Sequence, residues 1–302
     1  MNASVIITTF QRSHFLNRAI ESVLLQKTNY NYEVIIVDDN GLGTKNQLLT
    51  EKSIQSYIEQ KKVKYYPLES NKGACYARNY GLSKANGEYV FFLDDDDTFE
   101  NNKVEIQVSF MENNSNLDGC VAPFKRLSPE GNEIISSSNL PVIGDFINFS
   151  IRGNFFTPML CIKKSSLNSL GGFKDIDRFQ DRFLMLNALA KKMKFACLSI
   201  PLHTMYEHQE NRISNITIHK TILSLNKIFN FISQYEKLFT QEEWTSYKIN
   251  DLTIRATSYY LSVNRMDRLQ AAVIYFKICR LTLNKKHTLN FIKSILNIFR
   301  IK

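Results

Sequence analysis

Four short apolar segments recur at intervals of about thirty residues in the first third of the chain, at 5–9, 33–38, 63–67 and 89–93. Three of them are nearly continuous in apolar residues, which is typical of parallel strands covered on both faces. The segment at 63–67 alternates and contains Lys64, so we expect it at the edge of a sheet. Between the segments lie three stretches with helical character, at about 13–26, 44–60 and 73–85. This alternation predicts βαβ units in a doubly wound α/β sheet.

Polar residues follow the ends of the predicted strands. They are Thr9 after the first strand, with the aromatic Phe10 next to it, Asp38 and Asp39 after the second, Asn71 beyond the third, and Asp94 to Asp97 after the fourth. In open α/β sheets, ligands bind outside the carboxyl ends of the strands. We therefore expect the functional site at this edge of the sheet.

The four consecutive carboxylates Asp94 to Asp97 are the most specific chemical signal in the sequence. Two like charges at contact distance repel by about 4 kcal/mol at an effective dielectric constant of 20. A divalent cation relieves this repulsion, and Mg²⁺ and Mn²⁺ take carboxylate oxygens as ligands. Because Mg²⁺ typically binds through one or two carboxylates together with substrate phosphates, the run indicates an enzyme that handles a nucleotide diphosphate through a metal.

The composition is that of a globular protein. The 302 residues suffice for one large core or two smaller ones, and 44% are hydrophobic and 22% charged. The N-terminus already reads as a core strand rather than a signal peptide, and no apolar run reaches the roughly 18 residues of a transmembrane helix. Five scattered cysteines without a Cys-x-x-Cys motif indicate reduced thiols. We therefore expect a cytoplasmic protein.

The net charge of +9 lies mainly in the C-terminal segment, which has eight basic residues and no acidic one from Arg268 onward. Near its end a helical face is formed by Leu289, Ile292, Ile295, Leu296 and Phe299, and the basic side chains that fall mostly elsewhere are Lys293, Arg300 and Lys302. This pattern favours an interfacial helix on anionic lipid, and the alternative is a packed helix with a solvated basic face. We predict packing before Lys285 and peripheral membrane contact after it. Nucleic-acid binding is disfavoured because the basic residues alternate with aliphatic ones.

Beyond residue 100 the periodicity weakens. A helix is expected over about 98–112, followed by connections rich in Gly, Pro, Asn and Ser to about residue 153. Helical patterning returns at 179–192 and dominates from residue 219 onward.

Four sequence blocks, taken in order, resemble the family 2 glycosyltransferases with the GT-A fold. The blocks are residues 5–12, 34–39, 71–81, and 85–93 with the acidic run. The resemblance is dense over residues 3–100 and thinner to about 215. The first block has Thr8 where the family usually has proline and Gln11 where it usually has asparagine. The resemblance implies an α/β, Rossmann-like nucleotide-diphospho-sugar transferase with a C-terminal helical extension.

The patterning along the chain places soft boundaries near residues 100 and 217, and the resemblance implies the role of each part. Residues 1–100 would be the nucleotide-sugar-binding half, and residues 101–216 the acceptor-binding and catalytic half of the same domain. Residues 217–302 would form a helical, basic extension.

In this family the first strand end and the Asp pair hold the nucleotide base, which implies stacking by Phe10 and polar contacts from Thr9 and from Asp38 or Asp39. An ordinary turn is the alternative for the Asp pair. Arg78, near a predicted helix start at Gly73, would face the diphosphate or make a structural salt bridge. The nucleotide-binding residues implied are Thr9, Phe10, Arg12, Asp38, Asp39, Asn71, Arg78, Asp94 and Asp95.

The family's Asp-x-Asp motif falls on Asp94 and Asp96, with Asp94 nearer the ribose and Asp96 on a Mn²⁺ or Mg²⁺ ion. Asp95 would project to the other side of an extended chain. Asp97 would cap the next helix, with Glu100 completing a capping box. His208 resembles a late family histidine that completes the metal or diphosphate site, and a structural role is the alternative.

Inverting members of the family carry a catalytic base shortly after a Gly-Gly-Phe sequence, as the Asp of a Glu-Asp pair. Here Gly171-Gly-Phe173 is followed by Asp181, with Gln180 in place of the glutamate. Asp181 is therefore the candidate base, and Asp175 and Asp177 are alternatives. Arg178 and Arg182 would keep Asp181 ionised or form ordinary helix-face pairs.

The resemblance thus implies a metal-dependent, inverting transferase that moves a sugar from a nucleotide-sugar, expected to be UDP-linked, to a hydroxyl of a lipid-linked or growing glycan. We expect it at the inner face of the cell membrane, in O-antigen, capsule or exopolysaccharide synthesis. One rival is a nucleotide-sugar pyrophosphorylase, but the Gly-rich phosphate loop expected after its first strand is missing from residues 9–13. The other is a non-catalytic relative that binds sugar nucleotide or membrane.

Overall fold

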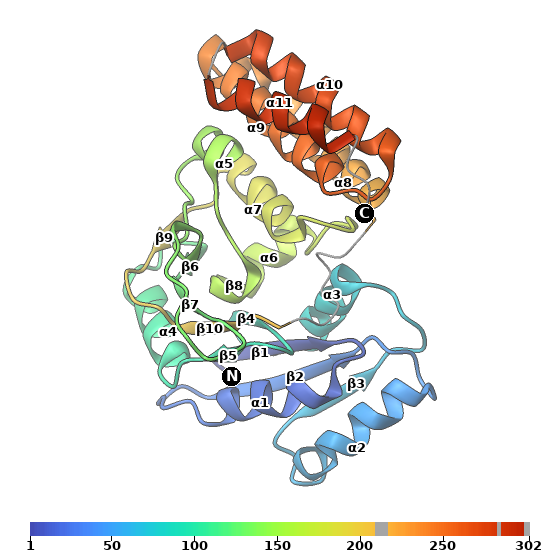
Figure 1. Cartoon of the computed structure of the whole chain (residues 1–302). Helices are drawn as coiled ribbons and strands as arrows, with labels where there is room; N and C mark the ends of the chain where they lie inside the picture. The colour runs from blue at the N-terminus through green and yellow to red at the C-terminus, as the bar shows by residue number, and fades with distance from the viewer. Residues whose placement is uncertain (209–216, 283–284, 299–302) are drawn as a thin grey trace. The chain divides into compact units, whose positions relative to one another are not determined.

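A computed structural model of the chain describes residues 1–208, 217–282 and 285–298 (Figure 1). These residues form two compact units. The first takes in the described residues of 1–149, 153–175 and 180–210, and the second those of 150–152, 176–179 and 211–302.

The first unit is built on a seven-stranded sheet with the order β3-β2-β1-β4-β8-β6-β9. Its strands are β1 (Ala3–Thr9), β2 (Tyr32–Asp38), β3 (Lys64–Pro67), β4 (Tyr89–Asp94), β6 (Gly119–Val121), β8 (Leu160–Lys163) and β9 (Phe195–Cys197). β1 pairs in parallel with β2 and β4, and β2 pairs in parallel with β3. The predicted parallel strands are therefore confirmed, and β3 lies at the edge as expected.

Helices cover both faces of this parallel region (Figure 1). Leu16 and Ile20 of α1 (Ser13–Leu24) share a buried cluster with Val5 and Ile7 of β1. The next side chain of the strand points to the other face, where α3 (Ala74–Lys84) packs so closely that a Cβ at Gly81 would lie 2.5 Å from Ile6. Double coverage explains why these strands are apolar without alternation.

The three predicted helices of this region agree closely with the structure, as α1, α2 (Lys45–Glu59) and α3. The Thr44 hydroxyl accepts a hydrogen bond from the Gln47 N–H and so caps α2. Gly73, at φ 87°, is the N-cap residue of α3, as expected for the helix start.

The helix predicted from residue 98 begins later. Thr98–Phe99 form the short strand β5, and α4 spans Lys103–Asn113. The Asp97 carboxylate accepts a hydrogen bond from the Tyr206 N–H at 3.2 Å. The predicted capping box of Asp97 and Glu100 was therefore wrong, because residues 98–99 pair with β10 (His203–Tyr206) instead of starting a helix.

The middle of the chain is more regular than its sequence indicates. Residues 113–153, expected to be connections, contain β6, β7 (Phe124–Leu127) and α5 (Phe146–Arg152). β7, β10 and β5 form a small second sheet, in the order β5-β10-β7. α6 (Lys164–Leu170) and α7 (Gln180–Ala190) complete the first unit. Strands of three or four residues are too short to carry a readable period.

The second unit is mainly helical. Its helices are α8 (Ile218–Ser233), α9 (Gln241–Tyr260), α10 (Arg265–Thr282) and α11 (Lys285–Ile298). Thr240 and Glu243 form a capping box at the start of α9. Ala256, Tyr275 and Ile278 form a buried cluster between α9 and α10. Among the described helices, none combines the length and the hydropathy that a membrane crossing requires.

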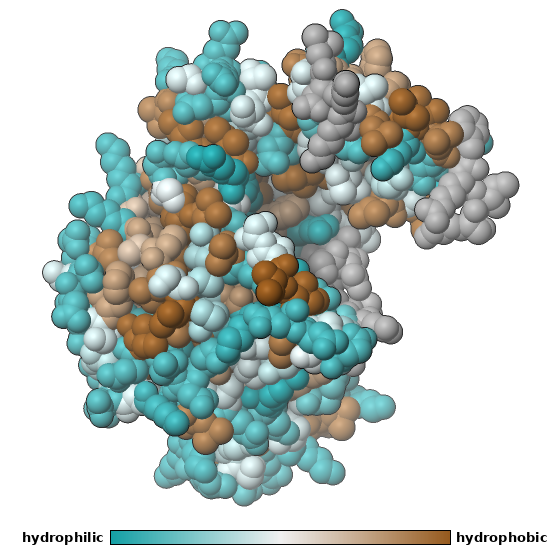
Figure 2. All heavy atoms as spheres, turned by 60° about the vertical axis from the view of Figure 1, so that its left-hand side comes forward, coloured by the Kyte–Doolittle hydropathy of each residue, from teal (hydrophilic) through white to brown (hydrophobic). Residues whose placement is uncertain are grey.

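Apolar side chains are exposed on the last two helices, and Figure 2 shows hydrophobic groups on the visible face of this unit. They are Met266, Leu269, Val273, Phe276 and Leu281 of α10, and Leu289, Ile292, Ile295 and Leu296 of α11. The buried positions of α11, in contrast, include the polar residues Ser294 and Asn297. Phe299, Arg300 and Lys302 of the predicted membrane face lie outside the described residues.

Candidate active site

Three strand ends meet at the candidate site. The register pairs Thr9 with Asp38 and Thr8 with Asp94, so the polar residues that follow β1, β2 and β4 lie at one edge of the sheet. Thr9 is buried, whereas the Phe10 side chain is 40% exposed. An exposed ring beside buried polar groups is suited to stacking on a nucleotide base.

Asp38 is fully buried and its carboxylate is well supplied with donors. The Tyr65 hydroxyl donates to Oδ2 at 2.7 Å, and the Asn40 N–H donates to Oδ1 at 2.9 Å. Burial raises the pKa of Asp38, and these hydrogen bonds oppose the rise. Asp38 thus stabilises the end of β2 through hydrogen bonds in the protein interior.

Asp39 holds the loop that leads into α3. Its carboxylate accepts from the Asn71 side chain at 3.0 Å and from the N–H groups of Lys72 and Gly73 at 2.7 and 2.8 Å. Burial raises the pKa of Asp39, against the effect of those two N–H groups. The structure therefore brings together Asp39 and Asn71, both expected at the nucleotide.

Arg12 neutralises part of the acidic run. Its guanidinium lies 2.6 Å from Asp95 Oδ1 and 2.5 Å from Asp96 Oδ2. Asp95 is completely buried, and burial raises its pKa to about 7 although Arg12 opposes this. The repulsion that the sequence predicts is thus relieved in part by Arg12, the residue directly before α1.

His208 lies against the same carboxylate. Its Nε2 is 2.7 Å from Asp96 Oδ2, and its ring packs on Phe15 with centroids 4.9 Å apart. The two residues expected from the sequence to bind metal are therefore neighbours in space, although 112 positions separate them in the sequence.

This donor set fits a divalent cation that is shared with a substrate. A carboxylate and an imidazole both bind Mn²⁺, and the carboxylate suits Mg²⁺ as well. In the described part of the chain, no group of three or more His, Cys, Asp or Glu side chains forms a metal cluster. A cation on Asp96 would thus take its other ligands from substrate phosphates or water, as Mg²⁺ commonly does.

Arg78 reaches the other end of the acidic run. Its Nη2 donates to Asp94 Oδ1 at 2.8 Å, and the guanidinium lies over the Phe173 ring at 5.4 Å. Arg78 is almost fully buried, whereas the Asp94 side chain is 36% exposed. Burial opposes the charge of Arg78, but Asp94 and Asp181 raise the pKa of Arg78 above its ordinary value.

Asp181, in the first turn of α7, is half-buried and interacts with this arginine. Its carboxylate accepts a short hydrogen bond from the Thr157 hydroxyl. Burial raises the pKa of Asp181, while Arg78 and the Thr157 hydrogen bond lower it. Asp181, the candidate base, and Asp94 of the acidic run thus both interact with Arg78.

The arginines next to Asp181 in sequence have other partners. Arg178 donates to the Thr221 hydroxyl at 3.1 Å, and Arg182 donates to the Gly153 carbonyl at 3.1 Å. Of the alternative bases, Asp177 lies 3.3 Å from Lys220. The positive charge that acts most strongly on Asp181 comes from Arg78, more than a hundred positions earlier.

Two further residues of the site carried no motif signal. Thr157 holds the candidate base, and the sequence indicates it only through a proline that follows it. Arg18 donates to the Asp96 carbonyl at 2.6 Å and lies 3.6 Å from the Tyr206 ring centroid. In the sequence, Arg18 was indicated by its position on the helix that follows the first strand.

Comparisons with known proteins agree on one family. Residues 4–173 match the family described as Glycosyl transferase family 2. An uncharacterised glycosyltransferase of Haemophilus influenzae is 31% identical over 244 residues, which are 80% of this chain and 88% of that protein. The Escherichia coli UDP-Glc:alpha-D-GlcNAc-diphosphoundecaprenol beta-1,3-glucosyltransferase WfgD is 34% identical over 37% of this chain and 42% of its own length.

The fold has a solved counterpart. Staphylococcus aureus TarS 1–349, in complex with UDP-GlcNAc, superposes with a TM-score of 0.62 at 16% identity, covering 99% of this chain and 90% of that one. This likeness confirms the predicted fold class. By contrast, the match to an uncharacterised glycosyltransferase of Rickettsia bellii, 37% identical over 42% of this chain, spans 17% of that relative's length.

Proposed function

Because this chain belongs to glycosyl transferase family 2, we propose that it transfers a sugar from a UDP-sugar to a hydroxyl of a lipid-linked or growing surface glycan, with inversion. UDP is supported by two relatives: WfgD uses UDP-Glc and TarS is solved with UDP-GlcNAc. WfgD acts on a diphosphoundecaprenol-linked sugar, which supports a lipid-linked acceptor in polysaccharide synthesis. Residues 1–100 would hold the donor and residues 101–216 the acceptor.

One observation carries the proposal: the Asp181 carboxylate accepts a hydrogen bond from the Thr157 hydroxyl and acts on the same arginine as Asp94. In the proposed reaction the acceptor hydroxyl oxygen forms a bond to the anomeric carbon, the bond from that carbon to the diphosphate breaks, and Asp181 takes the hydroxyl proton. A base opposite the leaving group gives inversion. Arg78 would stabilise negative charge near Asp94.

We assign the nucleotide to the edge formed by Thr9, Phe10 and the Asp38-Asp39 pair, with Arg12, Asn71, Arg78, Asp94 and Asp95 around it. The metal would be held by Asp96 and His208. When bound, a Mn²⁺ or Mg²⁺ ion would act as a Lewis acid on the departing diphosphate. Arg12 and His208 already contact Asp96, so a cation would have to compete with Arg12 for that oxygen.

We also propose peripheral membrane contact through the C-terminal helices at the cytoplasmic face. The support is the exposed apolar face of α11, whose buried positions include polar residues, together with the basic residues around it.

The test is a thermal-shift screen of UDP, GDP, dTDP and CMP, each with Mn²⁺ and with EDTA. A ligand that binds only the native state raises the melting temperature. We expect a shift with UDP that falls with EDTA and in Asp96→Ala, but that persists in Asp118→Ala, a carboxylate that bonds to Ser166. No shift with any nucleotide would contradict the proposal.

A further inference from the structure

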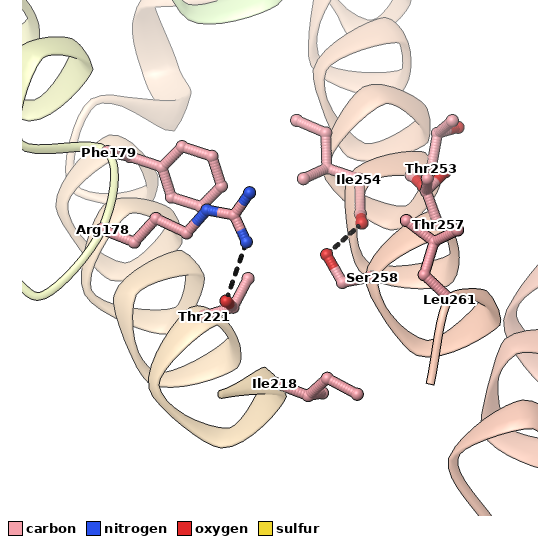
Figure 3. Close-up of a pocket in the computed structure, with 9 residues that line it drawn as sticks. All are labelled: Arg178, Phe179, Ile218, Thr221, Thr253, Ile254, Thr257, Ser258 and Leu261. Atoms are coloured by element: carbon pink, nitrogen blue, oxygen red, sulfur yellow. Dashed lines mark hydrogen bonds between the residues drawn. The ribbon is translucent and has the colours of Figure 1, made fainter. Parts of the chain in front are cut away.

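The second, mainly helical unit contains a pocket with a volume of about 400 Å³ (Figure 3). Its walls come from the segment 176–179, from α8 and from α9. The residues that matter for its chemistry are Arg178, Phe179, Ile218, Thr221, Ile254 and Ser258. A volume of this size is within the range of small-molecule sites.

Arg178 brings a positive charge into this pocket without a negative partner. Its Nη1 donates to the Thr221 hydroxyl at 3.1 Å, and its backbone N–H donates to Ser224 Oγ at 3.1 Å. Among the residues that the structure describes, no carboxylate forms an ion pair with Arg178, and Asp177 next to it faces Lys220 at 3.3 Å. Burial lowers the pKa of Arg178, which agrees with a charge that is partly desolvated and unpaired.

The Arg178 guanidinium has more N–H donors than the one that bonds to Thr221. Five N–H groups are available on an arginine side chain, and the planar fork matches the oxygens of a phosphate or carboxylate. Figure 3 shows the guanidinium extending from one wall toward Ile254 and Ser258 of α9. Ser258 also lines the pocket, and its hydroxyl donates to the Ile254 carbonyl at 2.9 Å.

Apart from Thr253 and Thr257, the rest of the lining is apolar. Ile218 and Ile254 supply aliphatic surface, Leu261 extends it, and the Phe179 ring lies 5.1 Å from the guanidinium of Arg178. An inorganic ion alone would leave this surface in contact with water. The combination of one unpaired cation with an apolar wall is suited to a ligand that is anionic at one end and aliphatic at the other.

The pocket is also joined through the chain to the proposed base. Phe179 has φ 63°, a conformation that costs a non-glycine residue about 1 kcal/mol or more. Asp181 follows two residues later in the sequence. A ligand that contacts Arg178 and Phe179 would stabilise this strained segment in one conformation.

We infer that this pocket binds a phosphate ester with an aliphatic segment, the phosphate on Arg178 and the aliphatic segment against Ile218 and Ile254. A phosphate is favoured over a carboxylate because it has a further oxygen for the hydroxyl groups beside the arginine. The inference does not depend on the proposed function, because none of the residues proposed for catalysis or nucleotide binding lines the pocket.

The test is isothermal titration calorimetry of the full chain with hexyl phosphate, inorganic phosphate, hexanoate and hexanol. Hexyl phosphate should bind at least tenfold more tightly than each of the other three. Arg178→Gln should weaken hexyl phosphate binding by tenfold or more, whereas Arg280→Gln, an exposed arginine of the same unit, should leave it unchanged. Equal effects of the two substitutions, or no binding by the wild type, would overturn the inference.

A second variant covers the case in which Arg178→Gln does not fold. Ser258→Leu fills the pocket and improves the helix propensity of α9, so it should retain its melting temperature and lose hexyl phosphate binding. Unchanged binding in this variant would overturn the inference as well. Cosedimentation with phosphatidylglycerol vesicles then separates two sources of the ligand: loss of vesicle binding in Arg178→Gln identifies a lipid headgroup, and retention with loss of hexyl phosphate binding identifies a soluble phosphate ester.

Discussion

At the scale of single residues, Asp181 is a half-buried carboxylate that the proposed reaction needs in its ionised form. Burial raises its pKa, so protonation should begin above the ordinary carboxylate range near pH 4. We predict that kcat/KM falls on the acid side of a pH profile, with an apparent pKa higher than 4. Initial rates of UDP release between pH 4 and 8 measure this, and a rate independent of pH over that range would contradict it.

Replacing the candidate base Asp181 should lower the catalytic rate without lowering stability. Asp181→Asn should lower kcat by about 10²–10⁴-fold, the usual contribution of a general base. It should not lower the melting temperature, because the substitution removes a charge whose ionisation burial disfavours. Asp177→Asn, at an exposed carboxylate of the preceding loop, is the control and should keep its activity. Undiminished turnover in Asp181→Asn would mean that another group is the base.

Lys103 is a buried charge outside the site. Its Nζ donates to Gln107 at 2.5 Å, and burial lowers its pKa to about 7. Between pH 7 and the ordinary lysine value near 10.5, the unfolded chain holds a proton that the folded chain has released. The free energy of unfolding should therefore rise with pH in that window, by up to roughly 1.4 kcal/mol per pH unit.

We predict that Lys103→Met removes this slope, since methionine has a similar volume and no proton to release. Urea unfolding at pH 7, 8 and 9 measures the slope in both proteins, and Lys125→Met, at a half-exposed lysine, is the control. The same slope in the wild type and in Lys103→Met would contradict the prediction.

At the scale of elements, the contact between α3 and β1 depends on a missing side chain. A Cβ at Gly81 would lie 2.5 Å from Ile6 Cγ2 and 3.2 Å from Val37 Cγ2. Gly81→Ala should therefore lower the free energy of unfolding by about 1–3 kcal/mol, although alanine is the better helix former. Ser83→Ala, exposed on the same helix, is the matched control and should be neutral or stabilising. Chemical denaturation of both variants decides this, and a stabilised Gly81→Ala would contradict it.

The elements also show where prediction from sequence succeeds. Strands such as β1 and β2 are long, buried on both faces and separated by capped helices, so their pattern predicts them. The capping prediction for Asp97 was wrong because a carboxylate followed by Glu100 matches a capping box. The pairing of β5 with a strand about a hundred residues later leaves no pattern in the local sequence. Likewise the motif blocks indicated Asp94, Asp96 and Asp181, but no local pattern could show that Arg78 acts on two of them. Sequence periodicity does not show which residues far apart in the chain come into contact.

At the scale of the whole molecule, the distribution of apolar surface leads to the last prediction. α11 exposes Leu289, Ile292 and Leu296, while Ser294 and Asn297 on its other face are buried. Burying exposed aliphatic side chains in a bilayer interface is favourable by about 1.5–3 kcal/mol each, and the basic residues of the segment add attraction to anionic headgroups.

We therefore predict that the protein cosediments with phosphatidylglycerol vesicles much more than with phosphatidylcholine vesicles, and less so at high salt. The double variant Ile292→Gln, Leu296→Gln should lower the partition coefficient by tenfold or more, since it removes two exposed aliphatic side chains from α11. The control is Leu48→Gln, which replaces a leucine of α2 that is 56% exposed and should change nothing. If both proteins bind vesicles like the wild type, α11 does not contact the membrane, and its exposed apolar face requires another partner.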